Sequence, residues 1–409
     1  MRIVISGHEI CGLIHDLAEE LERRGHVVVT VAMPHRFFPY SYDYEQHAFP
    51  ASYLTRRFGN RAMWRRVFQI LWEVQRSWHK AVELRLRIRL ARSADLYVRV
   101  WADIPFDCEV FQAIDRGVTR VASLLMGSDV RDYDVFRRQF GITRWEFPLE
   151  YHAVQLDRKL RVLRTHERYA DAVFSVPDQM GLALRPYHHL QVPLRLDKFT
   201  FRIPGRDVPI VVHAPSVPHV KGTDRILESL TSLRNEGIQF ELLSIRDVPH
   251  AELLKVLAEA DVLVDELVVH GPGWASFEAM ASGCAVATRY LEESPPCFRP
   301  PVWSIDEDNI VDRLRVLLTD RDLRIRLAEQ GRQYVEANNR IDHVVDELLR
   351  KSAGVDEADF DYMPDYLSTL YVPEDEEEAK VINSESRLVA DQPWYVAHVA
   401  GRSHDGLVF

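Results

Sequence analysis

The sequence contains few cysteines and no long apolar run. Its 409 residues hold four cysteines, and no two of them have the CxxC spacing of a redox or zinc motif. A disulfide framework and a cysteine-based metal site are therefore not expected, which fits a reducing compartment. No run of about 18 apolar residues occurs, so we expect no membrane-spanning helix. The start, MRIVISGHE, becomes polar too soon for a secretory signal, and we expect a cytoplasmic protein.

Acidic residues outnumber basic residues in the whole chain, but basic residues are concentrated in one segment. The formal net charge of −11 argues against general attraction to nucleic acid. Within residues 55–92, however, arginines and lysines recur among aromatic residues, and only Glu73 and Glu83 oppose them. One interpretation is peripheral contact with an anionic membrane surface or acceptor. The others are pairing with the acidic residues 356–378 of the same or a neighbouring chain, and ordinary solvation.

Short apolar runs alternate with amphipathic stretches along most of the chain. The first series predicts strands at 2–6, 27–31, 96–100, 119–125 and 172–176, with a turn at 7–12 and a helix at 13–24. The second series predicts strands at 210–213, 239–245, 261–265, 284–288 and 302–304. Its helices are expected near 223–236, 249–259, 274–282, 307–318, 321–337 and 340–351. Strands that alternate with helices favour parallel sheets of the α/β class.

We therefore expect two Rossmann-like, doubly wound α/β domains that face a cleft. The N-terminal domain covers 1–195, and a linker rich in proline and charge covers 196–209. The C-terminal domain covers 210–351, and its closing helices are expected to cross back to the first domain. Residues 352–409 are acidic, and we expect an extension that wraps back on the body or is partly disordered.

The stretch VVHAPSVPHVKGTDRILESL, residues 211–230, combines a strand, a polar loop and the start of a helix. Lys221 stands directly before Gly222, where the helix is about to begin. A helix start offers unpaired N–H groups and a positive dipole end, and a lysine beside it adds a full charge. The stretch therefore fits a phosphate site, and the alternative is an ordinary turn between a strand and a helix.

The stretch ADVLVDELVVHGPGWASFEAMASGCAVAT, residues 260–288, places a glycine-containing loop between a buried strand and a helix. Gly271 and Gly273 let backbone N–H groups approach a ligand closely. Glu278 lies in the first turns of the following helix. Its carboxylate fits an acceptor for sugar hydroxyls, and the alternative is charge compensation at the helix start.

Taken in order, these stretches resemble the retaining GT-B glycosyltransferases of family 4, also called group 1. VVHAPSVPHVKGTDRILESL, ADVLVDEL and FEAMASGCAVAT resemble that family's C-terminal domain. GHEICGLIHDLAEELERRGHVV resembles its first loop and helix, and LLMGSDVRDY resembles its GSDVR segment. RYADAVFSVPDQM and LRIRLAEQGRQYVEANNRIDHVVDELLR resemble the strand before the linker and the closing helices. The likeness runs over residues 1–351 and implies a GT-B fold.

The resemblance implies roles for residues on the donor side of the cleft. Lys221 matches the lysine that contacts the donor's diphosphate, and Gly222 matches the glycine after it. Glu278 matches the second glutamate of the E-x7-E motif, which holds the donor's ribose. His270 occupies the position of the first glutamate. The resemblance also implies that backbone amides meet the transferred sugar at Gly271, Gly273, Trp274 and Ala275.

On the other side of the cleft, the resemblance implies contacts from two segments. Gly7 and Gly12 match the flexible first loop, which approaches the donor phosphates and the acceptor. Asp129 and Arg131 lie in the GSDVR segment and are candidates for contacts with the acceptor or the sugar. Within the first loop, His8 and Glu9 fit a catalytic base or residues that only shape the loop.

The sequence also departs from the family pattern. Met126 stands where a histidine often precedes GSD, and the family's arginine before the lysine is absent from Pro215, Ser216 and Pro218. The loss of a cation weakens stabilisation of the leaving diphosphate. Arg246 or Arg289, each after a predicted strand, would restore the charge, or both are surface arginines.

The remaining candidates have simpler interpretations. His213 fits a ligand contact or a packed position beneath the phosphate loop. His188 and His189 have no third ligand at metal spacing, so no metal site is expected. Cys11 and Cys284 fit small core positions.

The expected function is transfer of a sugar from a nucleotide-sugar donor to an acceptor hydroxyl, as the resemblance implies, with retention and without a metal. No cofactor other than this donor substrate is expected. The missing motif residues favour an alternative, a degenerate GT-B protein that binds a nucleotide sugar or a partner without turnover. Another enzyme on the same fold, such as a sugar-nucleotide epimerase, is the second alternative.

Overall fold

A computed structural model describes residues 1–33, 40–45, 77–78, 80–102, 107–115, 117–142, 156–290, 298–354, 359–363 and 375–398. Most of the basic segment 55–92 lies outside these residues, and so does Cys297. The interpretations of that segment therefore stay predictions. Among the described helices, none is both long enough and apolar enough to cross a bilayer.

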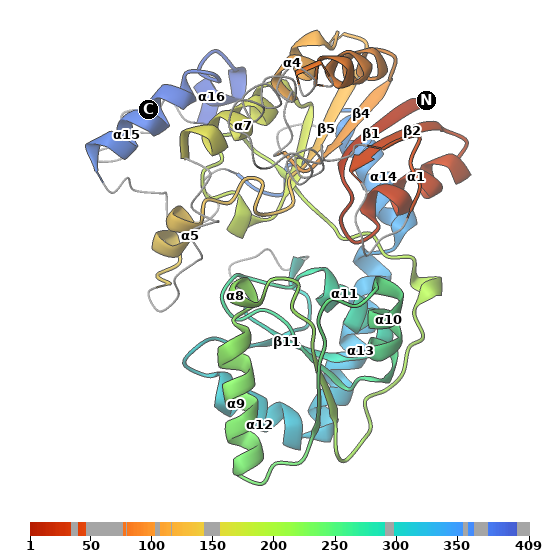
Figure 1. Cartoon of the computed structure of the whole chain (residues 1–409), viewed down its shortest axis with the longest axis vertical. Coiled ribbons are helices and arrows are strands. Elements are labelled where there is room, and N and C mark those ends of the chain that lie inside the picture. Colours follow the sequence, from red (N-terminus) through yellow and green to blue (C-terminus); the bar gives the residue numbers. More distant parts are fainter. Residues whose placement is uncertain are drawn as a thin grey trace, which may run out of the picture.

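The first half of the chain forms a seven-stranded sheet, in the upper part of Figure 1. Its strands are β1 (Arg2–His8), β2 (Val27–Met33), β3 (Tyr44–Glu45), β4 (Leu96–Val100), β5 (Arg120–Leu124), β6 (Ala172–Ser175) and β7 (His188–His189). Their order is β3-β2-β1-β4-β5-β6-β7, and all pairs are parallel. The order reverses between β1 and β4, which places the first loop at the point where such sheets bind ligands.

The second half forms a five-stranded parallel sheet, in the lower part of Figure 1. Its strands are β8 (Ile210–His213), β9 (Glu241–Ser244), β10 (Val262–Val264), β11 (Ala285–Thr288) and β12 (Trp303–Ser304). Their order is β12-β11-β10-β8-β9. The reversal lies between β8 and β10, so the loops that follow these two strands meet at one edge of the sheet. Both predicted glycine-containing stretches are these loops.

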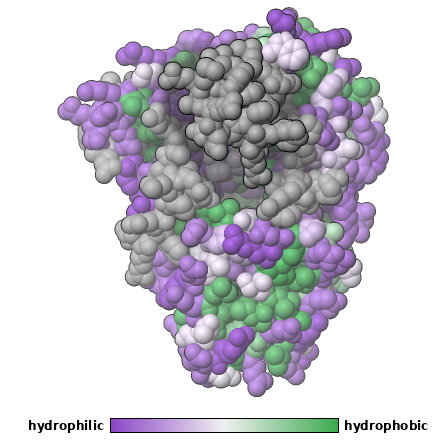
Figure 2. All heavy atoms as spheres, viewed as in Figure 1, coloured by the Kyte–Doolittle hydropathy of each residue, from purple (hydrophilic) through white to green (hydrophobic). Residues whose placement is uncertain are grey.

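Helices cover both faces of each sheet, as periodicity predicted. The N-terminal half has α1 (Leu13–Arg23), a helix at 80–92, α4 (Asp107–Ala113), α5 (Tyr133–Gln139) and α7 (Leu156–Tyr169). The C-terminal half has α8 (Pro218–Lys221), α9 (Thr223–Asn235), α10 (His250–Glu259), α11 (Trp274–Ser282), α12 (Ile310–Thr319) and α13 (Arg321–Asn338). In Figure 1, α9 and α12 lie on one side of the lower sheet and α10 and α13 on the other. Figure 2 shows apolar residues gathered on the visible face of this domain.

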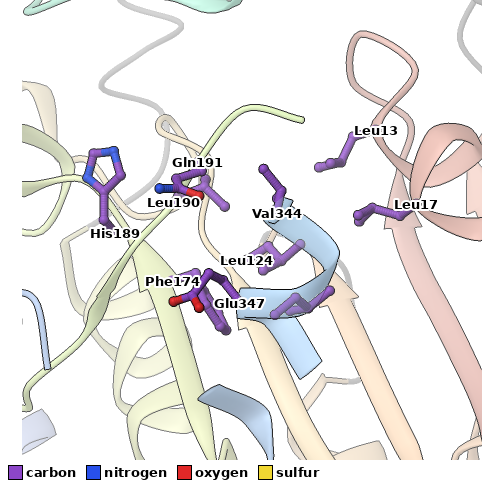
Figure 3. A pocket seen from close by; sticks show the side chains of 10 residues that line it. Leu13, Leu17, Leu124, Phe174, His189, Leu190, Gln191, Val344 and Glu347 are labelled. Atoms are coloured by element: carbon purple, nitrogen blue, oxygen red, sulfur yellow. The ribbon is translucent and has the colours of Figure 1, made fainter. Parts of the chain in front are cut away.

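The chain returns to the N-terminal domain in α14 (Ile341–Ser352), beside α1 in Figure 1. Val345 and Leu348 are buried in the same apolar cluster as Leu13 and Leu17 of α1. The predicted crossing of the closing helices is therefore confirmed. A cavity of about 30 Å³ remains between α14, α1 and the sheet, with Leu124 among its lining residues (Figure 3). It has room for about one water molecule, too little for a sugar or nucleotide.

Beyond α14, the described part of the acidic extension forms a bridge at Tyr362 to Tyr187 and two helices. Its helices are α15 (Glu376–Ser386) and α16 (Pro393–His398), and both lie on the N-terminal domain near α7 in Figure 1. Ile382 is buried in the N-terminal core. Glu378 pairs with Arg138 of α5, with 2.7 Å between Oε1 and Nη2. This part of the extension wraps back on the body, which is one of the two expected outcomes.

A polar layer crosses the N-terminal sheet near the carboxyl ends of its strands. Ser6, Arg99 and Ser123 are partners in register on β1, β4 and β5 and face one side. Arg99 Nε lies 2.6 Å from Asp107 Oδ1, and His166 bridges Asp107 and Ser123 at 3.2 and 2.8 Å. Serine, histidine and aspartate are the residue types of a hydrolytic triad, but all three side chains are buried under helices. The layer therefore serves the fold.

Candidate functional site

Lys221 is the last residue of α8, a single helical turn where the sequence predicted an open loop. Gly222 follows with a φ of 72°, a left-handed conformation that suits glycine and lets α9 begin at once. Lys221 Nζ lies 2.6 Å from Asp265 Oδ1 and 2.5 Å from Glu266 Oε1. The lysine side chain therefore points to the end of β10. The helix α9 begins at Thr223, directly after Lys221 and Gly222, as the sequence predicted.

The three charged groups of this cluster perturb one another. Burial acts against the charged form of Lys221, but the two carboxylates outweigh burial and raise the lysine's pKa. Burial also acts against the Asp265 carboxylate, but Lys221 and the Ser276 hydroxyl, 2.6 Å from Oδ2, lower its pKa. At Glu266, burial dominates and raises the pKa to about 7. One lysine therefore balances Asp265, while Glu266 exchanges its proton near neutral pH.

The start of α11 contacts this cluster. Its N-cap, Gly273, gives no side-chain cap, and the first turn has no acidic residue. A Cβ built on Gly273 would lie 3.0 Å from Glu266 Oε1 and 3.3 Å from Lys221 Nζ, so a larger residue would crowd the cluster. Trp274 packs on the N-terminal apolar cluster, and Ala275 packs inside its own domain. The helix start thus adds unpaired N–H groups and a positive dipole end beside Lys221.

Glu278 lies further along α11 and is buried. Its Oε1 is 2.6 Å from Nε2 of His250, the first residue of α10, and no partner of Oε2 lies among the described residues. Burial raises the pKa of Glu278 against the effect of His250. Burial acts to lower the pKa of His250, and Glu278 outweighs it and raises that pKa. Among the described residues, the pair therefore leaves the Oε2 atom of Glu278 without a hydrogen-bond partner.

The loop from Asp265 to Gly273 reaches the N-terminal domain through its middle. Val268 and Val269 are buried in one cluster with Tyr133 and Phe136 of α5. The His270 ring lies 5.8 Å from the Phe136 ring and 4.5 Å from the Phe140 ring, between ring centroids. The two domains therefore touch at α5, on one side of the cleft. The ends of the same loop remain beside Lys221.

The GSDVR residues hold the loop after β5. Asp129 is buried and accepts hydrogen bonds from the backbone N–H groups of Ala102, Met126 and Gly127, at 2.7 to 3.1 Å. Its carboxylate is thus occupied by the protein. Arg131 is also buried and pairs with Asp178, at 2.6 Å between Nη2 and Oδ2. Its guanidinium lies over the Phe136 ring at 5.1 Å, next to the site.

The first loop is shorter than predicted. Gly7 lies inside β1, and a Cβ there would be 2.0 Å from the carbonyl oxygen of Val100, so this glycine permits close strand packing. The expected turn at 7–12 is wrong at its first two residues. Gly12 has a φ of 85° and forms the N-cap of α1. Glu9 accepts N–H bonds from Ile14 and His15 and so caps the same helix.

His8 and Cys11 stand at the edge of this loop. Burial, with Arg99 and Arg87, lowers the pKa of His8 to about 4. Burial raises the pKa of the Cys11 thiol well above its usual range, with Glu278 contributing. The charge of Glu278 therefore acts on the first loop.

The other candidates fall into structural positions with one exception. His213 is buried, with Nδ1 2.8 Å from the Val264 carbonyl oxygen and Nε2 2.9 Å from Thr223 Oγ1. Arg246 is exposed, 3.6 Å from Asp247. His188 and His189 stack on Phe360 and Phe298, and Cys284 is a buried core residue. Arg289 is the exception, because it lies against the site loop, with Nη1 3.4 Å from the Val268 carbonyl oxygen.

One group of potential metal ligands occurs among the described residues, on α1. His15, Asp16 and Glu19 bring their ligand atoms within 4.8 Å of one another. Arg195, directly before the linker, pairs with both carboxylates, and Lys198 of the linker pairs with Asp16. These cations already balance the two carboxylates, so the group ties the linker to α1.

Sequence reasoning missed three residues of the site: Asp265, Glu266 and His250. Asp265 and Glu266 follow a buried strand at the switch point of the sheet, and that position was a usable signal. His250 meets Glu278 only because α10 and α11 pack side by side. Nothing in the local sequence around His250 indicates this contact.

Comparison with known proteins adds independent findings. Residues 221–350 match a family model described as glycosyl transferase-like. A search of curated proteins gives no match. Among solved structures, sucrose-phosphate synthase from Thermosynechococcus elongatus matches with 14% identity and a TM-score of 0.55, over 85% of this chain and 98% of that one.

Two further structures match over most of their length. An alpha-glucosyltransferase, solved with UDP-glucose and DNA, shares 12% identity with a TM-score of 0.51, covering 86% of this chain and 99% of that one. WaaG, a glycosyltransferase involved in lipopolysaccharide biosynthesis, shares 14% identity with a TM-score of 0.51, covering 87% and 100%. At such identities these likenesses show the fold alone. The chain therefore has the GT-B fold, and its residues 221–350 are similar to a glycosyl transferase-like family, as its sequence motifs indicated.

Proposed function

We propose that this protein transfers a sugar from a nucleotide-sugar donor to an acceptor hydroxyl. The observation that carries the proposal is the position of Lys221 beside the uncapped start of α11. Negative charge grows on the diphosphate as the glycosidic bond breaks. A buried lysine and unpaired helix N–H groups, fixed in advance, stabilise that charge.

The carboxylates beside Lys221 make the site responsive to an incoming phosphate. Glu266 has a pKa of about 7, so it takes up a proton at little cost when another negative charge approaches. Lys221 is then free to turn from Glu266 to the diphosphate, while Asp265 keeps it in place. The diphosphate of the donor thus takes the place of the Glu266 carboxylate as an anionic partner of Lys221.

Glu278 is proposed to hold the ribose of the donor. His250 fixes the carboxylate through Oε1, and Oε2 accepts from a ribose hydroxyl. Two solved neighbours carry UDP or UDP-glucose, which supports a nucleotide diphosphate as the ligand class. Retention of configuration and independence from metal are part of the proposal, on the resemblance of the sequence to the retaining group. Lys221 and the helix start would fill the role of a metal.

A thermal-shift series with UDP, ADP, GDP and CDP tests the proposal, because a ligand that binds only the folded state raises the melting temperature. We expect one base to give a clear shift, and Lys221→Ala to weaken its binding at least about tenfold. The matched control is Lys255→Ala, an exposed lysine of the same domain that pairs with Glu252. It should bind as the wild type does.

Absence of a shift with every nucleotide would reject the proposed donor site. It would favour the degenerate, partner-binding alternative. Binding without sugar transfer or donor hydrolysis would keep the site and reject the turnover.

A further inference from the structure

The middle of the loop 265–273 carries a histidine with an unused nitrogen. His270 Nδ1 is buried and has no hydrogen-bond partner among the residues that the structure describes. The ring is held by edge contacts with Phe136 and Phe140, so it does not turn freely toward other groups. Burial, with Arg289 and Arg131, lowers the pKa of His270 to about 3, so the ring is neutral. A neutral histidine in this place contributes a hydrogen bond but no charge.

Arg289 adds a positive charge beside this histidine from the C-terminal domain. Its carbonyl oxygen accepts from the Gly271 N–H at 2.7 Å, which fixes it against the loop. The side chain is half-buried and makes a single long hydrogen bond, to the Val268 carbonyl oxygen. Among the described residues, no carboxylate lies within ion-pair distance of its guanidinium, and Asp306 and Glu307 act only from further away.

Arg131 adds a second guanidinium from the N-terminal domain. One nitrogen pairs with Asp178, but in the described part of the chain Nε is buried without a partner. The Phe136 ring contacts both Arg131 and His270. Two arginines from two domains therefore flank the loop, and among the described residues only Asp178 forms an ion pair with either of them.

The carboxylates of the donor site are bonded to another cation. Asp265 and Glu266 both pair with Lys221, at the ends of the loop. Glu266 acts on Arg131 only from further away, and Arg289 lies against the middle of the loop. A buried guanidinium without a full set of partners is costly, and an anion would supply the missing acceptors.

We propose that the site around His270, Arg289 and Arg131 binds an anionic group, a carboxylate or phosphate, on the sugar that lies next to the donor's diphosphate. This inference rests on the proposed function, because it takes the diphosphate at Lys221 as its reference. The group has two sources. It is the carboxylate of a uronic acid in the donor, or a phosphate on the acceptor sugar.

The experiment compares ligands that differ only in this group. Calorimetry would measure the dissociation constants of UDP, UDP-glucose and UDP-glucuronic acid, or of GDP, GDP-mannose and GDP-mannuronic acid if guanosine is the preferred base. A second arm would measure glucose and glucose 6-phosphate in the presence of the diphosphate. Each arm uses the full chain, Arg289→Gln and the matched control Arg246→Gln, an exposed arginine on the same domain.

We expect the anionic ligand of one arm to bind about tenfold more tightly than its neutral counterpart. Arg289→Gln should remove the preference without changing the affinity for the diphosphate, and Arg246→Gln should keep it. The arm that shows the preference identifies the source of the anion.

Equal binding of neutral and anionic ligands in both arms, with the diphosphate still bound, would overturn this inference and leave the proposed function standing. A preference that survives in Arg289→Gln would also overturn it. Failure of every nucleoside diphosphate to bind would overturn the proposed function itself.

Discussion

Each half of the molecule buries a cluster of charged side chains near the carboxyl ends of its strands, but the two clusters are built differently. In the N-terminal half, Asp107 has two partners, Arg99 and His166. In the C-terminal half, two carboxylates share one cation, Lys221. Both clusters are buried, so their difference lies in the balance of charge.

The pKa values follow that balance. Burial acts to raise the pKa of Asp107, and Arg99 and His166 more than offset it and lower the pKa. At Glu266 burial wins, because Lys221 is already committed to Asp265, and the pKa rises to about 7. The first cluster keeps its charge and stabilises the fold. The second has one carboxylate too many for its cation, which suits a site that exchanges ligands.

Asp107→Asn gives the largest expected effect. The substitution leaves the buried Arg99 without its carboxylate, and we expect the free energy of unfolding to fall by about 3–5 kcal/mol. Urea unfolding measures the loss. Nucleotide affinity of the folded fraction should stay at the wild-type value. A loss of less than about 1 kcal/mol would be no larger than that of an exposed ion pair. It would show that the pair of Arg99 and Asp107 contributes little to the stability of the fold.

Glu266→Gln tests the proton exchange of the second cluster. The pKa of Glu266 is raised on folding from 4.5 to about 7, so its protonated form stabilises the fold below pH 4.5. That contribution is at most about 3 kcal/mol of the free energy of unfolding, and it disappears as the pH rises through 7. The stability of Glu266→Gln relative to wild type should therefore increase between pH 4.5 and 7.

Thermal unfolding across this pH range measures the difference. Glu252→Gln, at an exposed carboxylate of the same domain, is the control and should follow the wild-type profile. Parallel curves for wild type and Glu266→Gln would mean that Glu266 does not exchange its proton in this range.

Glu278→Gln should have a smaller effect, confined to the ribose. The wild type is expected to bind a ribonucleoside diphosphate several-fold more tightly than its 2′-deoxy or 3′-deoxy analogue, because Oε2 accepts from a ribose hydroxyl. In Glu278→Gln that ratio should fall toward one. An unchanged ratio in titration calorimetry would remove Glu278 from the ribose site.

Glu378→Gln should have the smallest effect and extends the comparison to the surface. Its pair with Arg138 joins α15 to α5 but is partly exposed. We expect a loss of less than about 1 kcal/mol in the free energy of unfolding. A loss as large as that of Asp107→Asn would show that charge pairs, and not the burial of Ile382, hold the extension in place.

Local pattern predicted most of the fold. The strands at 96–100 and 210–213 and the helix at 274–282 appear with the predicted bounds, since apolar runs and glycines mark their ends. The bend of Lys221 toward Asp265 and Glu266 was not predictable in the same way. It depends on contacts 44 and 45 residues apart in the sequence, which only the packing of β8 beside β10 creates.

The prediction for Gly7 erred for a related reason. Glycine commonly marks a turn, but here the close approach of β4 requires it inside a strand. The extension beyond α14 was read as irregular because of its acidity. Its acidic residues include Asp375, whose side chain caps α15, and the first turn of that helix, where negative charge is favourable.

The return of α14 to the N-terminal domain affects how the protein is made. Val345 and Leu348 complete an apolar cluster whose other fully buried members lie in residues 3–174. During synthesis the apolar cluster of the first domain therefore stays incomplete, with Leu13 and Leu17 uncovered, until α14 has been translated. A ribosome-bound chain that stops at the linker would expose this apolar surface, and it would be a target for chaperones.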